Sequence, residues 1–196
     1  MKKLSTLSNN GIIYGDMRTK DSILELENLC KDIDENMRNT IIEIGCYRGE
    51  STSVFCKYFK RVICIDPWLR GYDKTDRGST ENGDYIKNDF INNMKSYKNI
   101  TIIRKFSYNA INDIELMLNN TLVDAIYIDA GHQYKHVSAD LKNYEKFVKK
   151  NGYICGDDYK IKYPGLMKSV DEFRNKKEFI NKEFKIYKNN SFMLKK

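Results

Sequence analysis

The fold is decided by one stretch of sequence, TIIEIGCYRGES at residues 40–51. Residues 40–44 form a short run rich in β-branched side chains, which is typical of a buried strand. Gly45 and Gly49 follow at once, and residues 50–59 have a composition typical of a helix. Because glycine permits unusual backbone angles and close approach of a ligand to the backbone, the stretch predicts a strand, a binding turn and a helix.

Glu43, two residues before the first glycine, makes this turn more specific. The turn has neither the GxGxxG pattern of dinucleotide sites nor the GK[ST] of a phosphate-binding loop. The alternative for this stretch is an ordinary strand-to-helix turn. Cys46 lies inside the turn, close enough to meet a cofactor by position alone, and we interpret it as a packing residue.

Strand-like and helix-like segments alternate along most of the chain. Strands are expected at residues 40–44, 61–65, 100–104, 123–128 and 152–155, and helices from residue 20 onward and at 50–59, 84–97, 110–118, 133–149 and 166–176. This alternation predicts an α/β fold in which helices cover both faces of a parallel sheet. Two further strands, at 179–187 and 191–194, have no helix between them and predict an antiparallel hairpin at one edge.

Length and composition fit one domain of 196 residues, in which residues 1–38 form a loop and a helix that cover the core. No apolar run is long enough to cross a bilayer, and the amino terminus lacks the apolar region of a signal peptide. We therefore expect no membrane span and a cytoplasmic location. Five cysteines without a CxxC pair favour neither a disulfide framework nor a structural zinc site.

The chain carries a formal net charge of +7. A basic surface can attract nucleic acid, anionic sugars or membranes. The lysines are scattered, however, whereas a nucleic-acid surface is normally a patch or a stripe. We interpret them as a solvated surface and expect no nucleic-acid partner.

Asp66 lies about twenty residues beyond the first glycine, directly after the next expected strand. An acid at this place can accept hydrogen bonds from both ribose hydroxyls of a nucleoside cofactor. Asp66 alone does not distinguish NAD from S-adenosylmethionine, because NAD enzymes use the same arrangement. An acid before Pro67 is also common in turns, but the glycine turn and Asp66 together favour a nucleoside site.

Three further acids follow expected strands: Asp129 follows the fourth, and Asp157 and Asp158 follow the fifth. The carboxyl ends of parallel strands meet at one edge of a sheet, so these side chains should converge. Neighbouring carboxylates repel each other unless a cation or a proton lies among them. Oxygen ligands suit Mg²⁺, Mn²⁺ or Ca²⁺ better than zinc.

The chain's two histidines, His132 and His136, lie in the same region. Their i, i+4 spacing can place them on one helix face, but the glutamate of the HExxH zinc motif is absent. We predict His132 as a catalytic base, because histidine concentrates at active sites, and His136 as a structural or substrate contact. The alternative for His132 is a helix cap or a hydrogen bond to the backbone.

Five ordered blocks resemble the small class I S-adenosylmethionine-dependent methyltransferases, which include metal-dependent sugar O-methyltransferases and the cephalosporin-hydroxylase-like group. The blocks are EIGCYRGEST, CIDPW, YIDAGHQYKHVSADLKNY, NGYICGDDY and YPGLMKSVDEF, within residues 43–173. The resemblance implies a Rossmann-like fold with a seven-stranded, mostly parallel sheet and a C-terminal antiparallel hairpin. It also implies S-adenosylmethionine as cofactor, with Mg²⁺ or Mn²⁺.

The same resemblance implies the site residues. Those implied to bind the cofactor are Glu43, Gly45, Tyr47, Gly49, Ser51, Asp66, Trp68, Ser107 and Asp129. Among them, Asp66 would hold the ribose, Trp68 would pack against the adenine or roof the site, and Ser107 would lie near the adenine. The implied metal ligands are Asp129, Asp157 and Asp158, and the implied catalytic residues are His132 and Asp129. Departures from the family pattern at Asn151, Ala130 and Leu166 remove no ligand.

The implied reaction is methyl transfer to a hydroxyl of a sugar or another glycan-type small molecule. A phenol or catechol and an RNA are alternative acceptors. A non-catalytic nucleotide-binding protein is the alternative from another class, against which the three acids and His132 argue. Residues 69–83 are polar and contain three glycines, which suits a lid over the substrate. The exposed hairpin edge could pair with a second copy in a homodimer.

Overall fold

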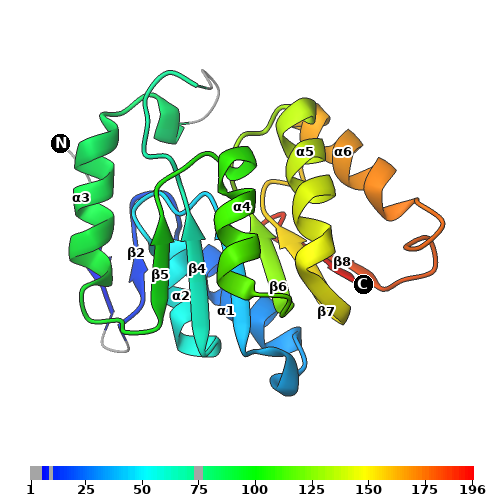
Figure 1. The fold of residues 1–196 in the computed structure, drawn as a ribbon. Coiled ribbons are helices and arrows are strands. Elements are labelled where there is room, and N and C mark those ends of the chain that lie inside the picture. Colours follow the sequence, from blue (N-terminus) through cyan, green and yellow to red (C-terminus); the bar gives the residue numbers. More distant parts are fainter. Residues whose placement is uncertain (1–5, 9–10, 73–76) are drawn as a thin grey trace.

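The computed structural model describes residues 6–8, 11–72 and 77–196, which form an α/β fold around one large sheet (Figure 1). Its seven strands have the order β5-β4-β3-β6-β7-β9-β8. They are β3 (Thr40–Ile44), β4 (Arg61–Ile65), β5 (Ile100–Ile103), β6 (Val123–Ile128), β7 (Val148–Gly156), β8 (Phe184–Ile186) and β9 (Phe192–Lys195). Strands β3 to β7 pair in parallel, whereas β9 is antiparallel to β7 and β8. The predicted mostly parallel, seven-stranded sheet with a hairpin at its edge is confirmed.

Helices cover both faces of this sheet. They are α1 (Lys20–Asp32), α2 (Glu50–Tyr58), α3 (Gly83–Met94), α4 (Ser107–Leu118), α5 (Tyr134–Tyr144) and α6 (Pro164–Arg174). Side chains of neighbouring strand residues point to opposite faces. Accordingly, Ile41 packs in the core under α1, α2 and α3, whereas Ile42 packs in the core under α4, α5 and α6. In Figure 1, α4 and α5 lie in front of the sheet, and α1 and α2 lie behind it.

The order of the strands determines where a ligand can bind. From β3 the chain continues outward to β4 and β5, and it then returns to the other side of β3 to form β6 and β7. In open α/β sheets, ligands bind beyond the carboxyl ends of the strands at such a reversal. The loops after β3, β4, β6 and β7 therefore surround the expected site.

Several element bounds differ from the predictions. The predicted helix at 133–149 ends at Tyr144, and a short 3-10 turn (Glu145–Phe147) leads into β7, which starts at Val148. The predicted strand at 179–187 is only Phe184–Ile186. The segment predicted as a loop, 1–18, contains two short antiparallel strands, β1 (Thr6–Leu7) and β2 (Ile13–Tyr14).

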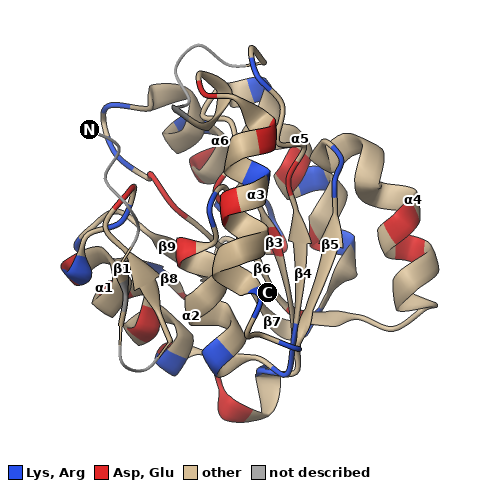
Figure 2. Cartoon of the chain, turned by 90° about the vertical axis from the view of Figure 1, so that its left-hand side faces the viewer, with Lys and Arg blue, Asp and Glu red and all other residues tan. Residues whose placement is uncertain are grey.

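Over the side shown in Figure 2, basic and acidic residues are interleaved. Within residues 6–8, 11–72 and 77–196, none of the helices combines the length and the apolar character that crossing a bilayer demands. Residues 73–76 of the predicted lid lie outside the described residues, and a 3-10 turn (Arg77–Ser79) precedes α3. The five cysteines are buried free thiols.

Candidate functional site

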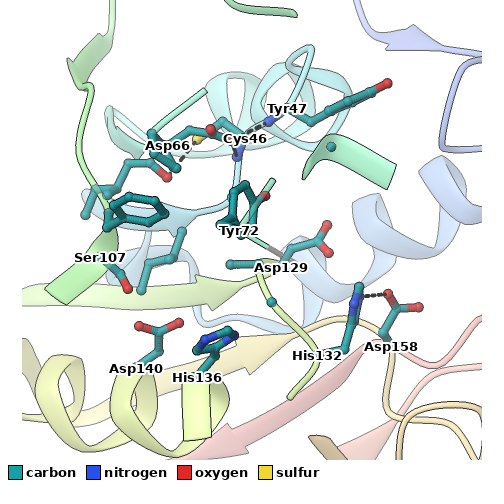
Figure 3. Close-up of a pocket in the computed structure, with 18 of the residues that line it drawn as sticks. Cys46, Tyr47, Asp66, Tyr72, Ser107, Asp129, His132, His136, Asp140 and Asp158 are labelled. Atoms are coloured by element: carbon teal, nitrogen blue, oxygen red, sulfur yellow. Dashed lines mark hydrogen bonds and ion pairs between the residues drawn. The ribbon is translucent and has the colours of Figure 1, made fainter. Parts of the chain in front are cut away.

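A cavity of about 580 Å³ lies at the carboxyl ends of the parallel strands. Its volume falls within the range of about 300–1,000 Å³ that is usual for small-molecule sites. Figure 3 shows Asp66 and Cys46 on one wall and His136 and Asp140 on the facing wall, with Asp129 between them. Met17 and Arg18, which precede α1, also line the cavity. The sheet therefore brings together the ends of separate strands, as the sequence predicts.

The glycine turn after β3 is fixed by its contact with the end of β6. Gly45 has a φ of +88°, and a Cβ built on it would lie 1.9 Å from the carbonyl oxygen of Asp129. The amide of Asp129 donates a hydrogen bond of 2.8 Å to the carbonyl of Ile44. A side chain at position 45 would therefore push the two strand ends apart.

Asp66, after β4, holds the glycine turn in shape. Its Oδ2 accepts hydrogen bonds of 2.9 Å from the amides of Cys46 and Tyr47. Its Oδ1 accepts one of 2.7 Å from the amide of Trp68. Because Asp66 also lines the cavity, it joins the turn to the predicted ribose position, and the ribose role itself stays a prediction.

Glu43 lies beneath the turn and not on the cavity wall, and its role in cofactor binding stays a prediction. Its side chain is fully buried, and its carboxylate accepts hydrogen bonds from the hydroxyls of Ser51 and Thr52 in α2. Burial raises the pKa of Glu43 to about 7, although the two hydroxyls oppose the shift. Glu43 therefore joins β3 to the start of α2, while Ser51 lines the cavity.

Gly49 and Trp68 also lie behind the cavity wall, and their roles in cofactor binding stay predictions. Gly49 has a φ of +88° and packs against Met94 and Phe90 of α3. The Trp68 ring packs on Phe90 with 5.0 Å between ring centroids, and its Nε1 donates to the carbonyl of Tyr47 at 2.8 Å. Gly49 and Trp68 therefore connect the glycine turn to α3. Tyr47 itself lines the cavity.

Ser107, the first residue of α4, lines the part of the cavity next to α5. Asp140 of α5 lies on the same wall and is 4% exposed. Burial raises the pKa of Asp140 to about 7, and a hydrogen bond with Ser107 opposes the shift. Sequence reasoning missed Asp140, because one acid within an amphipathic helix pattern normally indicates the solvent-facing side.

The three predicted metal ligands are near the site, but an arginine lies among them. Nη2 of Arg18 is 2.6 Å from Oδ2 of Asp129 and 2.8 Å from Oδ2 of Asp157. The same atom donates to the hydroxyl of Tyr127 at 3.1 Å. Burial lowers the pKa of Arg18, but Tyr127 and the two acids raise it above its ordinary value, so the guanidinium stays charged.

His132 and Asp158 form a second pair on the cavity wall. Nε2 of His132 lies 2.7 Å from Oδ2 of Asp158, and the His132 ring stacks on Tyr163 with 4.0 Å between centroids. Lys160 pairs with the other carboxylate oxygen of Asp158. Burial opposes the shift, but the contacts with His132 and Lys160 lower the pKa of Asp158.

This arrangement does not fit the expected divalent metal. The oxygens of Asp157 contact Arg18 and the hydroxyl of Ser191, which lies 3.1 Å from Oδ1. Both oxygens of Asp158 also have protein partners, Nε2 of His132 and the Lys160 ammonium. A cation needs carboxylate oxygens turned toward one centre, and Arg18 already holds that position between Asp129 and Asp157.

Among the described residues, one group of three potential ligands comes within 4.8 Å: Glu43, Cys46 and Cys64. All three side chains are buried. Burial raises the pKa values of Cys46 and Cys64 above their ordinary range, whereas a metal requires thiolates. We interpret this group as core packing beneath the turn.

Comparison with known proteins agrees with the fold. Residues 42–159 match a family described as a methyltransferase domain. Protein R132 of Acanthamoeba polyphaga mimivirus, described as uncharacterized, is 35% identical over 137 residues, or 68% of this chain. The match spans 57% of that relative, so the chain covers less than two thirds of its length.

Solved structures share the architecture at low sequence identity. The calicheamicin methyltransferase CalS11 has a TM-score of 0.67 and 13% identity, with 90% of this chain and 80% of that chain covered. The O-methyltransferase NovP has a TM-score of 0.66 and 16% identity, with 89% and 78% covered. The O-methyltransferase of Bacillus cereus in complex with SAH has a TM-score of 0.61 and 16% identity, with 91% and 82% covered. These identities show a shared fold.

The family match covers the parts of the chain that build most of the cavity. The matched segment exceeds half of the chain and contains the glycine turn, Asp66, Asp129 and Asp158. The sheet order and the helices on both faces agree with the solved methyltransferases. The chain therefore belongs to the methyltransferase-domain family and shares the fold of these solved methyltransferases.

Proposed function

We propose that the chain transfers the methyl group of S-adenosylmethionine to a hydroxyl oxygen of a sugar or another glycan-type small molecule. One observation carries the proposal: the glycine turn, Asp66, Asp129 and His132 line one cavity. The cofactor and the acceptor can therefore meet between these walls. A structural neighbour, CalS11, is described as a TDP-rhamnose 3'-O-methyltransferase, which supports a sugar acceptor.

The walls near the turn and α5 suit the nucleoside half of the cofactor. Asp66 presents a carboxylate next to the turn, where ribose hydroxyls can donate hydrogen bonds. Ser107 and the buried Asp140 lie further along the cavity, where polar edges of adenine can find hydrogen-bond partners. When bound, the cofactor supplies a methyl group on a positively charged sulfur.

The chain's contribution to the reaction is to orient the acceptor and receive its proton. The acceptor oxygen forms a bond to the methyl carbon while the carbon–sulfur bond breaks, and that electron pair stays on sulfur. Asp129 is the base that we assign, because its carboxylate lies between the two walls (Figure 3). Arg18 holds Oδ2 of Asp129, so the carboxylate keeps a fixed direction.

His132 is assigned a positioning role, which revises its predicted role as the base. Its Nε2 faces Asp158, and its Nδ1 is shielded from solvent. The ring lies flat against Tyr163. This geometry makes His132 a rigid part of the acceptor wall, and proton transfer to it would require the ring to leave Asp158.

The acceptor half of the cavity combines aromatic and basic side chains. Tyr163, which stacks on His132, lines it together with Lys162. Aromatic faces provide apolar area while their hydroxyls offer hydrogen bonds, a combination that suits a polyhydroxylated ring. The interleaved surface charges in Figure 2 give no support to an RNA acceptor, which needs a clustered basic face.

The proposal is tested with the purified chain, S-adenosylmethionine and a panel of sugar nucleotides and free glycosides. We expect calorimetry to show binding of S-adenosylhomocysteine, and mass spectrometry to show one added CH₂ unit on one acceptor. Asp129→Asn should lower kcat by about 10²-fold or more with little change in S-adenosylhomocysteine affinity.

His136→Asn is the matched control, because His136 lines the same cavity away from Asp129. We expect this variant to change KM more than kcat. Binding of NAD instead of S-adenosylhomocysteine would overturn the proposal. Full activity of the Asp129→Asn variant would overturn the assignment of the base.

A further inference from the structure

The segment before α1 is fixed against the start of α2. We call residues 16–18 the strap. The carboxylate of Glu50 accepts hydrogen bonds from the three consecutive strap amides, of Asp16 at 2.8 Å, Met17 at 2.9 Å and Arg18 at 2.8 Å. The Asp16 side chain also pairs with Arg48. The backbone of the strap is therefore tied directly to the glycine turn and α2.

The strap places one guanidinium inside the acid cluster. Arg18 is 8% exposed, and its Nη2 reaches Asp129, Asp157 and Tyr127. Arg18 and Asp129 are 111 positions apart in the sequence. The segment that matches the methyltransferase family begins only at residue 42, so the family match does not assign a role to Arg18.

We propose that Arg18 is the resident cation of this site and holds Asp129 and Asp157 without a divalent metal. The inference rests on the proposed function only for the identity of Asp129 as the base. Arg18 is a positioning residue, because it acts on the acceptor through Asp129. The implied class of enzyme is a metal-independent O-methyltransferase.

The balance of charge supports this assignment. Arg18 partners Asp129 and Asp157, and Lys160 partners Asp158. A guanidinium stays charged at all working pH values and offers several donors in a fixed plane. One arginine can therefore bridge two carboxylates that would otherwise repel each other.

A hydrated Mg²⁺ would compete poorly for the same oxygens. Mg²⁺ requires near-octahedral oxygen ligands and loses water reluctantly. To admit it between Asp129 and Asp157, the buried Arg18 side chain would have to leave both acids. The Glu50 contacts keep the strap backbone in place, so the displaced guanidinium would stay close and repel the metal.

The first test is titration of the metal-free chain with Mn²⁺, followed by electron paramagnetic resonance and by the melting temperature. We expect the wild type to show no saturable binding at millimolar Mn²⁺ and no rise in melting temperature. Saturable binding that is lost in Asp129→Asn would overturn the proposal. This readout needs neither the cofactor nor an acceptor, so a failure of the proposed function remains distinguishable.

The second test removes the guanidinium. Arg18→Met leaves Asp129 and Asp157 unbalanced, so we expect a lower melting temperature and saturable Mn²⁺ binding that the wild type lacks. Arg18→Lys restores a positive charge, and we expect it to abolish most of the gained Mn²⁺ binding. If the folded Arg18→Met variant gains no Mn²⁺ binding, Arg18 is not the group that excludes the metal, and the proposal is wrong.

A matched control separates the gain of Mn²⁺ binding from the general effect of losing a buried ion pair. Lys149 lies 2.6 Å from Asp124, whose side chain is fully buried away from the cavity. Lys149→Met should also destabilise the chain, but it exposes no pair of acids, and no Mn²⁺ binding is expected. If Arg18→Met does not fold, the wild-type titration still decides between the two outcomes.

Discussion

Replacement of Gly45 by alanine tests whether the cavity depends on contact between two strand ends. The new Cβ would lie 1.9 Å from the carbonyl oxygen and 2.6 Å from the carbonyl carbon of Asp129. These are backbone atoms, so a rotamer change cannot relieve the overlap. A Cβ almost never lies closer than 3.0 Å to another heavy atom. The end of β3 would therefore have to move away from β6 by about 1 Å.

The cost of the substitution has three parts. Alanine at a positive φ costs about 1–2 kcal/mol wherever it occurs. The displaced strand ends would also lose the 2.8 Å hydrogen bond from Asp129 to Ile44, and a buried backbone group left unpaired costs about 1–3 kcal/mol. With overpacking strain of about 1–3 kcal/mol, we expect Gly45→Ala to lower the free energy of unfolding by about 3–8 kcal/mol in total.

Gly71 supplies a matched control within the same chain. It has the same φ of +88°, but a Cβ there meets nothing within 4 Å. Gly71→Ala should therefore cost only the backbone part, about 1–2 kcal/mol. Urea unfolding, followed by the fluorescence of Trp68, gives both values, and S-adenosylhomocysteine affinity reports the cavity. If the two variants differ by less than about 1 kcal/mol, the strand-end contact does not restrain the turn.

Two other substitutions test the acids beside the turn. The pKa of Glu43 is raised to about 7 by burial, so its stabilising effect is complete below the unfolded-state pKa and is lost as pH rises through 7. Relative to Glu43→Gln, the wild type should therefore lose about 3 kcal/mol of unfolding free energy between pH 4 and pH 8, measured by urea titration; parallel pH profiles would contradict this. Asp66→Ala should weaken S-adenosylhomocysteine binding about tenfold or more in calorimetry, and unchanged affinity would remove Asp66 from the ribose role.

The sheet was predictable because its signals are local. Buried parallel strands appear as short β-branched runs, and β3, β4 and β6 start and end where those runs do. The ends of other elements depend on partners that are distant in sequence. The helix predicted to reach residue 149 stops earlier because Val148 pairs with Val123 of β6. The strand predicted from Phe179 starts later, because Phe179 stacks on Phe173 of α6 with 4.8 Å between centroids.

The site was predictable as a location and less so in its contacts. The positions after the strands identified Asp66, Asp129 and His132, all of which line the cavity. The direction of each side chain was not available from spacing. Glu43 turns beneath the loop because Ser51 and Thr52 offer two hydroxyls there, and the motif that contains both residues does not indicate this pairing.

The acid cluster shows why a charge pattern leaves its counter-ion undetermined. Strand topology requires Asp129 and Asp157 to meet, and electrostatics then requires a positive charge between them. A metal and an arginine both meet that requirement, and the sequence signal for the acids is the same in either case. The guanidinium comes from a segment before α1, held by Glu50 through backbone amides that carry no sequence signature. The identity of the cation therefore follows from the path of residues 16–18, which only the folded chain defines.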